Sequence, residues 1–495
     1  MITITSLITI IAVSALVLSL IFVFALGKKP KDWQETTLLY LQNFVGSLFI
    51  FSGFVKAIDP KGTAYKLEQY FGEFETVFAA PLSNIFPVLA NFALAFSIFT
   101  IVLELILGVT LIFGIKRKLT SWIVLPLIIF FTVLTGFTYL SAYSPSSMAF
   151  MLIITSIVML LAGSYLAKNK IARIVIGVLL LLVPGILINM IMTKGYTFNF
   201  SFGDWDYVKS NMKVTDCGCF GDFLKLEPMV SFWKDIVLLP PAIWFAFAHG
   251  KMTKVLSDKA GNIVLIAAAV LSFLFCWKNS NMGLPMADFR PFHVGANIPA
   301  DKAACEADID EIERYLTYSK LDGSEEMEIK ASELTNHRYL WESGEWEPLK
   351  DKTRDVVIKK GCDSKVKDFE FSDANGADIS GQTLAAEGYQ FMVISYSLPK
   401  SSKKGYLKVN AIAEAAEAEG INTFAVTAFN SDEAIDEFRH AIQAGYEFHR
   451  ADDILLKTIV RSNPGILLMK DGTIVEKWHH KKLPSYDKIK AKYMQ

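Results

Sequence analysis

The stretch "VTDCGCFGDFLKLEP" at 214–228 places Cys217 and Cys219 one residue apart, in a chain with five cysteines among 495 residues. A thiol reacts as its thiolate, and thiol–disulfide exchange needs a second cysteine that resolves the mixed disulfide. Gly218 gives the backbone the freedom to close a small, strained ring, and strained, exposed disulfides are the ones that exchange readily. The pair therefore has the composition of a working dithiol.

Two other interpretations of the pair stay open. Asp216 and Asp222 argue against a reactive thiol, because nearby negative charge raises the pKa of a thiol. The pair could be a structural staple with each sulfur bonded elsewhere, since Cys305 and Cys362 are predicted on the same side of the membrane. A metal site needs three or four ligands; the sequence has no second closely spaced cysteine pair and its seven histidines show no ligand spacing, so no metal is predicted.

The bulk composition indicates a membrane protein. The chain is 52% hydrophobic with 37 Phe, and its mean hydropathy is +0.35, values typical of a multi-span membrane protein. A net charge of -1 argues against a nucleic-acid partner. Residues 1–277 are apolar with sparse charges, whereas residues 278–495 have the composition of a soluble domain.

Roughly twenty apolar residues cross a bilayer core, and eight runs qualify. The first lacks a positive n-region and a cleavage site, so it is predicted to be a retained span and not a signal peptide. The run 231–248 is the weakest, because Pro240 and Pro241 interrupt it and Lys234 with Asp235 stands at its start. The eight predicted spans are 3–26, 38–57, 88–114, 120–143, 148–167, 172–193, 231–248 and 260–277.

Alternate loops carry three basic residues each, and the positive-inside rule makes these loops cytoplasmic. With eight spans, both termini, the loop 194–230 and everything after 277 then lie on the periplasmic side, where disulfides persist. The predicted location is the bacterial inner membrane, in contact with the lipid bilayer. The basic residues are Lys28, Lys29 and Lys31; Lys116, Arg117 and Lys118; Lys168, Lys170 and Arg173; and Lys251, Lys254 and Lys259.

Two ionisable residues fall inside predicted spans. Glu104 lies in the middle of the third and Lys56 near the outer end of the second. Charges at membrane depth are costly, so both are expected to face the bundle interior. They are candidates for cofactor binding; the alternatives are a structural Lys56–Glu104 pair, or a snorkelling Lys56 with a protonated Glu104. Cys276, at the end of the last span, is expected to be a buried apolar filler.

The part outside the membrane is predicted to contain a linker with a small β-rich segment at 278–365 and an α/β domain at 366–495. In the latter, strands alternate with helices and a hairpin turns at Asp471-Gly472, a pattern typical of an α/β sheet. The segment "KDFEFSDANGADIS" predicts two strands joined by a turn at Asn375-Gly376. Strands are further predicted at 327–334, 355–361, 389–398 and 421–429, and helices at 403–420 and 431–444.

A family resemblance rests on three motifs. "LFIFSGFVKAIDPKGTAYKLEQYF" (48–71), followed by "LELILGVTLIFG" (103–114), resembles the DoxX family of bacterial membrane proteins over about 38–145. "DCGCFGD" with the following "WKDIVLL" is similar to MauE-type proteins, which are four-helix membrane proteins. The resemblance implies a role in thiol or disulfide maturation at the outer face of the membrane, with redox chemistry linked to a quinone.

The C-terminal domain resembles thioredoxin-like proteins of the peroxidase-related kind over about 366–495. "RSNPGILLMKDG" matches their proline-led strand, which implies a cis bond between Asn463 and Pro464 and a surface there that docks an extended peptide. Where the family carries Cys-x-x-Cys, this chain has Leu398 to Ser401, and no cysteine follows Cys362. The domain is therefore expected to bind clients, or to act as a lid or scaffold, without dithiol chemistry of its own.

The fold class predicted is an α-helical polytopic membrane bundle of about eight spans plus a periplasmic α/β thioredoxin-like domain. The predicted function is thiol–disulfide maturation of envelope protein clients, with Cys217 and Cys219 as the catalytic pair and possible coupling to a quinone. The alternative from another class is a non-enzymatic envelope assembly or interaction subunit, part of a larger membrane complex, with a structural Cys-Gly-Cys loop.

Overall fold

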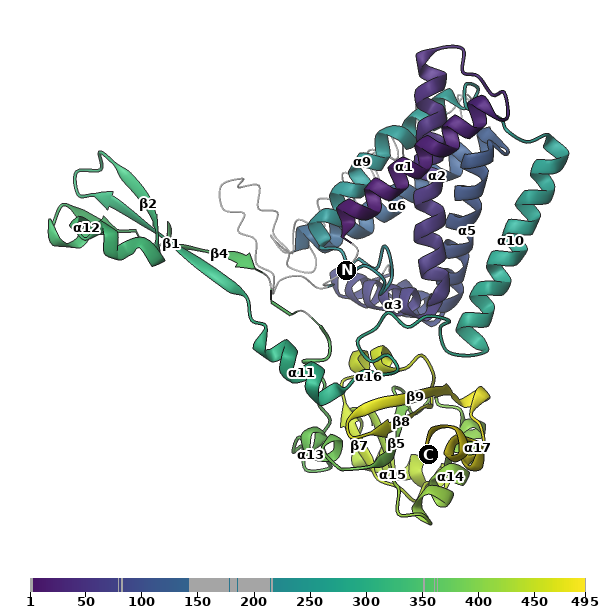
Figure 1. Ribbon diagram of the computed structural model, residues 1–495, viewed down its shortest axis with the longest axis vertical. Helices are drawn as coiled ribbons and strands as arrows, with labels where there is room; N and C mark the ends of the chain where they lie inside the picture. Colours follow the sequence, from purple (N-terminus) through teal and green to yellow (C-terminus); the bar gives the residue numbers. More distant parts are fainter. Residues whose placement is uncertain are drawn as a thin grey trace. The chain divides into compact units, whose positions relative to one another are not determined.

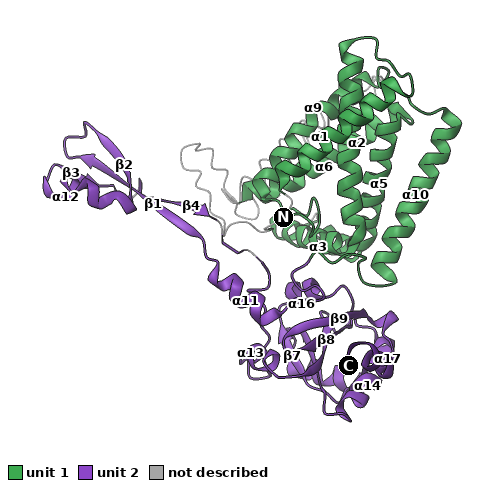
Figure 2. Cartoon of the chain, in the orientation of Figure 1, with its two compact units in different colours: residues 1–289 green, residues 290–495 purple. Residues whose placement is uncertain are grey.

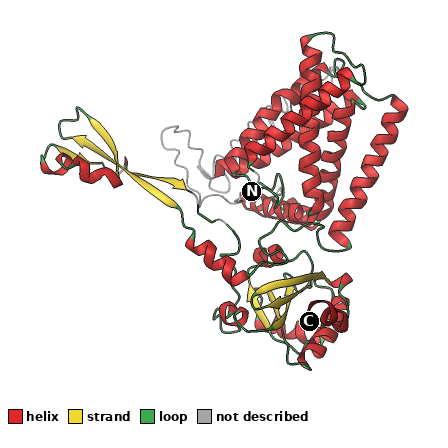
Figure 3. Cartoon of the chain, viewed as in Figure 1, coloured by secondary structure: helices red, strands yellow, loops and turns green. Residues whose placement is uncertain are grey.

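The computed structural model describes residues 3–141 apart from 79 and 82, residues 178, 185 and 214, and residues 217–494 apart from 350, 351, 360 and 363. The chain divides into two compact units, 1–289 and 290–495 (Figure 2). All the described strands belong to the second unit (Figure 3).

The first unit is a bundle of long helices (Figure 1). Among the described residues, six helices are long and apolar enough to cross a membrane, and each coincides with a predicted span. The spans predicted at 148–167 and 172–193 lie outside the described residues. The six helices are α1 (Ile4–Phe24), α2 (Trp33–Ile58), α5 (Ala93–Phe113), α6 (Arg117–Ser141), α9 (Pro228–Ala248) and α10 (Asp258–Asn281). The chain is thus a membrane protein.

Local sequence signals set the ends of these helices. The Asp32 side chain accepts a hydrogen bond from the Glu35 amide (2.8 Å) at the start of α2, which satisfies one of the orphan N–H groups of the first turn. Gly114 ends α5 in the left-handed conformation, with φ 62°, as is common for glycine after a helix. Pro240 and Pro241 do not interrupt α9, although they weakened its prediction.

A further helix, α3 (Pro60–Val77), was not predicted from the sequence. It follows α2 directly, because Asp59 caps it through the Gly62 amide (3.1 Å) and Pro60 occupies its first turn, a favourable combination for a helix start. It lies across one end of the bundle in Figure 1, and the short α4 (Ile85–Asn91) follows.

Helices α2 and α5 pack closely through glycine. A Cβ atom on Gly46 would come within 2.9 Å of the Gly108 carbonyl oxygen, and one on Gly108 within 2.8 Å of the Gly46 carbonyl oxygen. Small residues allow such backbone approach in membranes, where apolar burial alone does not drive helix association. This packing places the second half of α2 against the middle of α5, where the site is formed.

The second unit begins with α11 (Ile298–Ala307) and a small antiparallel sheet in which β1 (Glu311–Lys320) pairs with the three others. Its partners are β2 (Glu326–Lys330), β3 (Trp346–Pro348) and β4 (Arg354–Lys359). The sequence predicted β2 and β4 but not β1, and the strand predicted at 327–334 gives way to the 3-10 helix η2 (Ala331–His337) and α12 (Tyr339–Glu342). Cys305 and Cys362 form a disulfide across this segment, which answers a question that the sequence left open.

The rest of the second unit is a five-stranded sheet in the order β7-β6-β5-β8-β9. Strands β5, β6 and β7 are parallel, and β8 and β9 are antiparallel to their neighbours. The bounds are β5 (Tyr389–Ser395), β6 (Asn422–Ala428), β7 (Phe448–Ala451), β8 (Gly465–Lys470) and β9 (Thr473–His479), with α13 (Ser380–Leu384), α14 (Lys403–Glu417), α15 (Asp432–Ile442), α16 (Asp453–Ile459), η4 (His480–Lys482) and α17 (Tyr486–Tyr493). The α/β architecture is confirmed.

Two local predictions for this sheet had different outcomes. The hairpin turn at Asp471-Gly472 is confirmed, with both residues at positive φ, as a tight two-residue hairpin requires. The two strands predicted around Asn375-Gly376 are wrong: Ser372 and Asp378 form only an isolated bridge. Ser372 also bridges to Arg450 of β7, so this segment is bonded to the sheet and not to a long hairpin partner.

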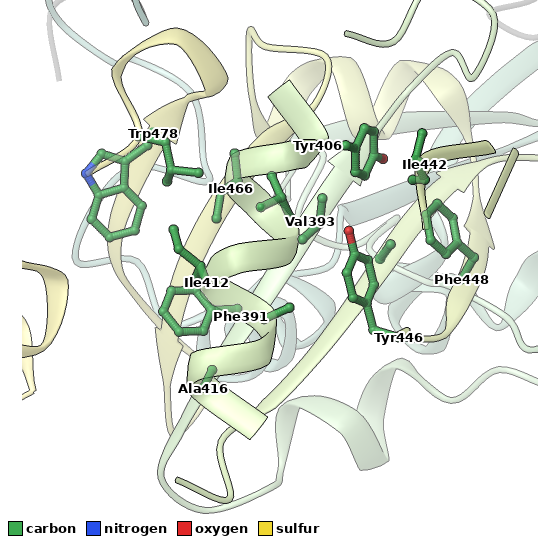
Figure 4. Packing of buried hydrophobic residues seen from close by; sticks show 14 of the residues in the cluster. Phe391, Val393, Tyr406, Ile412, Ala416, Ile442, Tyr446, Phe448, Ile466 and Trp478 are labelled. Carbon is green, nitrogen blue, oxygen red and sulfur yellow. The ribbon is translucent and has the colours of Figure 1, made fainter. Parts of the chain in front are cut away.

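Helix α14 packs across the sheet and forms the core of this domain (Figure 4). Ile412 and Ala416 on one helix face lie against Phe391 and Val393 of β5. The two strand residues are buried, and the burial of each such side chain contributes about 1.5–3 kcal/mol. The domain therefore has an apolar core of its own.

Candidate active site

The Cys-Gly-Cys loop folds as a tight turn just before α9. Gly218 and Gly221 adopt positive φ values of 61° and 54°, which glycine reaches without steric cost. The Gly221 amide donates to the Gly218 carbonyl oxygen (3.1 Å). The structure therefore requires glycine between the two cysteines, and neither Cys217 nor Cys219 is in a disulfide.

The loop is inserted into the bundle and does not stand clear of it. Phe220 is 1% exposed and packs on Phe51 of α2, with ring centroids 5.8 Å apart. The Ser52 hydroxyl of α2 donates to the Cys219 carbonyl oxygen (2.9 Å). These contacts hold the Cys219 backbone against the second half of α2.

Lys56 and Glu104 form an ion pair inside the bundle. Lys56 is 6% exposed and Glu104 is 3% exposed. The predicted interior position of Glu104, near Lys56, is therefore confirmed. Lys56 Nζ also lies 5.0 Å from the centroid of the Phe131 ring, within the range of a cation–π contact. The pair follows from the α2–α5 packing.

A second buried ion pair joins Lys234 to Asp235 at the start of α9. The Thr135 hydroxyl of α6 donates to Asp235 (3.0 Å), and Asp235 is 2% exposed. In the sequence, these two residues were only charges that weakened the prediction of the seventh span. They lie six and seven residues after Pro228 in a potential cap-and-proline start, Glu227-Pro228, which was the available signal that they lie within a helix.

One pocket brings the two ion pairs and the two cysteines together. It encloses about 840 Å³ of space including its mouth, between α2, α3, α5, α6 and α9. Both cysteines line it, as do Lys56, Glu104 and Lys234. The apolar part of the wall consists of Leu48, Phe49, Leu67, Ile128, Phe130, Phe131, Leu134, Phe220 and Leu238. Catalytic and cofactor candidates that the sequence named separately thus share one pocket.

The Cys219 thiol is sensitive to these charges. Burial raises the pKa of the Cys219 thiol above its usual range, because the interior disfavours the thiolate. The positive charges of Lys234 and Lys56 act in the opposite direction and lower that pKa, whereas the Asp235 carboxylate raises it. Cys219 is therefore mostly a neutral thiol at pH 7, and its thiolate fraction depends on Lys234.

Removal of either member of the second ion pair is expected to change Cys219 reactivity in opposite directions. With Cys217→Ser as the background, Lys234→Gln raises the Cys219 pKa further and slows its alkylation severalfold at pH 8. Asp235→Asn removes the charge that raises the pKa and frees Lys234, so alkylation becomes faster. Rates with a small alkylating reagent between pH 7 and 10 measure both effects; equal rates in the two variants would contradict the electrostatic coupling.

Cys276 has a different environment. It is fully buried in a small apolar cluster with Ala57, Ile98 and Ile101. Cys276 thus fills apolar space inside the bundle, as predicted.

In the second unit, the predicted cis peptide bond between Asn463 and Pro464 is confirmed. Asn463 is 8% exposed. Its side-chain amide donates a hydrogen bond to the Ser397 carbonyl oxygen (2.7 Å), and its main-chain carbonyl oxygen accepts one from the Ser402 amide (3.1 Å). The segment that replaces the family dithiol therefore engages Asn463 internally. Peptide binding by Asn463 and Pro464 stays a prediction.

Together, a bundle of apolar helices with buried charges and an attached α/β domain define a polytopic membrane protein. Residues 34–168 match the model of the family "Methylamine utilisation protein MauE", so this part of the chain is MauE-like. The match covers α2 to α6, with the motifs at 48–71 and 103–114, and it ends before the Cys-Gly-Cys loop. No curated protein and no solved structure matches the chain.

Proposed function

We propose that the protein is an inner-membrane thiol–disulfide oxidoreductase that matures envelope proteins through Cys217 and Cys219. The observation that carries the proposal is the pocket in which both cysteines meet the Lys56–Glu104 and Lys234–Asp235 ion pairs. Buried ionisable groups around a reactive side chain are characteristic of functional sites. The MauE-like character of 34–168 agrees with the thiol maturation that the resemblance implied.

We assign different roles to the two sulfurs. In the oxidised state, a client thiolate attacks Cys217 of a Cys217–Cys219 disulfide, and Cys219 leaves as a thiolate that takes up a proton. The second client thiolate then attacks the mixed disulfide, the client disulfide forms, and Cys217 is released as a thiol. The client loses two electrons and two protons, and the cysteine pair gains them. Lys234 and Lys56 stabilise the departing Cys219 sulfur.

We propose a quinone as the electron acceptor, because the pocket has aromatic walls and cationic groups able to donate hydrogen bonds to carbonyl oxygens. The Lys56 and Lys234 ammonium groups would hold its oxygens, and Phe49, Phe130 and Phe131 would flank its ring. When bound, a quinone supplies a two-electron, two-proton acceptor that restores the disulfide. Glu104 and Asp235 are the carboxylates positioned to accept protons there, because both are buried at the pocket.

We further propose that the C-terminal domain is thioredoxin-like and positions clients. The cis proline before β8 and the mixed sheet support this assignment. Leu398 to Ser401 occupy the segment after β5 where the family carries its dithiol, so the domain binds and does not exchange. Pro399 and Lys400 are exposed there and are available to an extended client.

Thiol trapping in intact cells tests the proposal. A maleimide added with and without a reductant is expected to label Cys217 and Cys219 only after reduction in the resting state, and directly when the acceptor is depleted. Labelling that never changes with reductant would favour the alternative function. A Cys217→Ser/Cys219→Ser variant identifies background labelling from the other cysteines.

The proposed orientation places both termini in the periplasm. A reporter that is active only in the periplasm, fused after Gln495, is expected to be active, because the basic loops are held on the cytoplasmic side. A matched fusion after Lys118, in a predicted cytoplasmic loop, is expected to be inactive. Activity of the second fusion and not the first would contradict the compartment on which disulfide chemistry depends.

The alternative is an envelope assembly subunit in which the loop is structural. The observation that favours it is that Asn463 makes its hydrogen bonds to Ser397 and Ser402 within the domain. In this alternative the second unit serves as a scaffold. In that case the pocket would serve packing, and both ion pairs would serve only helix association. The variants described in the Discussion separate the two functions.

A further inference from the structure

A second pocket lies at the other end of the same bundle. It contains about 980 Å³ of space including its mouth, between the turn that joins α5 to α6 and the loop that joins α9 to α10. Its lining includes four basic side chains and one carboxylate: Lys116, Arg117, Lys118 and Lys254 against Asp258. This excess of positive charge at one concave site is suited to an anion.

The frame of this pocket is fixed by hydrogen bonds between the two loops. Arg117 donates to the carbonyl oxygen of Gly250 (3.1 Å) and also bonds that of Met252. The Val255 amide donates to the Phe113 carbonyl oxygen (3.0 Å). A Cβ on Gly114 would come within 2.0 Å of a carbonyl oxygen of the opposite loop, so the loops are in direct contact and the pocket is preformed.

Two of the cations are available to a ligand. Arg117 is engaged by backbone carbonyls, and Lys254 pairs with Asp258 (2.8 Å). Lys116 and Lys118 are exposed, and neither has an ion-pair partner in the described part of the chain. Both stand at the start of α6, where the helix dipole also favours negative charge.

The pocket also has an apolar side. Leu119 is 59% exposed, and Trp122 lines the same pocket one turn along α6, a candidate membrane span. Tryptophan favours the membrane–water interface, and Trp33 with Trp244, whose rings lie 6.1 Å apart, marks the same end of the bundle. A ligand here would meet cations at one end and apolar surface at the other.

We infer that this pocket binds the phosphate headgroup of an anionic phospholipid, with its acyl chains along the outer face of α6. Basic pockets between spanning helices on the cytoplasmic side bind such headgroups, and these loops are the ones predicted to be cytoplasmic. The inference stands apart from the thiol chemistry, since no residue of this pocket lines the cysteine pocket.

The test compares lipid retention in native mass spectrometry of the purified full-length protein. The probes are phosphatidylglycerol, phosphatidylcholine of matched chain length, and inorganic phosphate. Wild type is expected to retain phosphatidylglycerol preferentially. The Lys116→Gly/Lys118→Gln variant is expected to lose about tenfold or more of that preference, because each lysine near the surface is worth about 1 kcal/mol. Lys116 already has a φ of 45°, so glycine there keeps the backbone conformation without strain.

The matched control is Lys29→Gln/Lys31→Gln, which removes the same charge from the loop between α1 and α2, outside the pocket. Full retention by this control, together with loss in the pocket variant, supports the site. Equal loss in both variants would reduce the effect to general surface charge and overturn the inference. Competition by millimolar inorganic phosphate that displaces the lipid would also overturn it, because a free anion would then be the ligand.

Discussion

The Cys219→Ser variant is expected to lose all activity and to accumulate a mixed disulfide between Cys217 and client protein. The Cys217→Ser variant is expected to lose activity equally, without that adduct. The asymmetry follows from the proposed roles. The Ser52 hydroxyl bonds the Cys219 carbonyl oxygen, and the positive charges of Lys234 and Lys56 act on the Cys219 thiol, so we assign Cys217 as the sulfur that meets the client. In the Cys219→Ser variant, the Cys217 thiolate attacks the disulfide of an oxidised client, which is the reverse of the oxidation step, and releases one client thiol. The mixed disulfide then persists, because Cys219 is not there to displace the client sulfur. Non-reducing gels of cells that express each variant measure the adduct.

The control for this experiment is Cys276→Ala, which removes a sulfur in an apolar cluster and is expected to leave activity unchanged. Complementation of a deletion strain by the Cys217→Ser/Cys219→Ser variant at normal protein level would exclude the redox function. The assembly function would then remain, with the second unit as its interaction surface. An adduct through Cys219 and not Cys217 would reverse the assigned roles while it kept the dithiol chemistry.

The second large effect is expected at the Lys56–Glu104 pair. Glu104→Gln leaves Lys56 as a buried charge without its carboxylate partner, and loss of one member of a buried pair costs about 3–5 kcal/mol. The melting temperature of the purified protein in detergent is expected to fall accordingly, and activity with it. Leu271→Ala, at a position of α10 that is 67% exposed, is the control and is expected to change little.

A paired replacement separates stability from function at this site. Lys56→Met/Glu104→Leu removes both charges, and replacement of a buried pair by apolar residues is often neutral or stabilising. If the two residues act in catalysis, the double variant regains the melting temperature but not the activity. If it regains both, the pair serves only helix association, and the part of the proposal that assigns proton transfer to Glu104 is wrong.

Much of the local structure could be predicted from the sequence because local physical chemistry determines it. The six described spans coincide with apolar runs long enough for a bilayer. Ser431, the first residue of the helix predicted at 431–444, caps α15, and the turn at Asp471-Gly472 joins β8 to β9. In each case the determining residues are neighbours along the chain.

Other segments could not be predicted from the sequence. Strand β7 has four residues, and the sequence pattern around Phe448 and His449 is too short to show alternation. The pattern around Asn375-Gly376 does alternate, but Ser372 bonds to β7 and to Asp378 by single bridges. Tertiary partners therefore decided these segments against their own propensity.

The sequence alone determined that Cys217 and Cys219 lie in a loop between predicted spans, that Glu104 and Lys56 must avoid lipid, and that the C-terminal domain lacks a dithiol. The tertiary structure decided which groups meet. It paired Cys305 with Cys362 and brought Lys234, from a helix that follows the loop, to the Cys219 thiol. Spans and turns depend on interactions within a few residues, whereas the chemistry of the Cys219 thiol depends on charges that only the packing of α2 and α9 around the loop brings within reach.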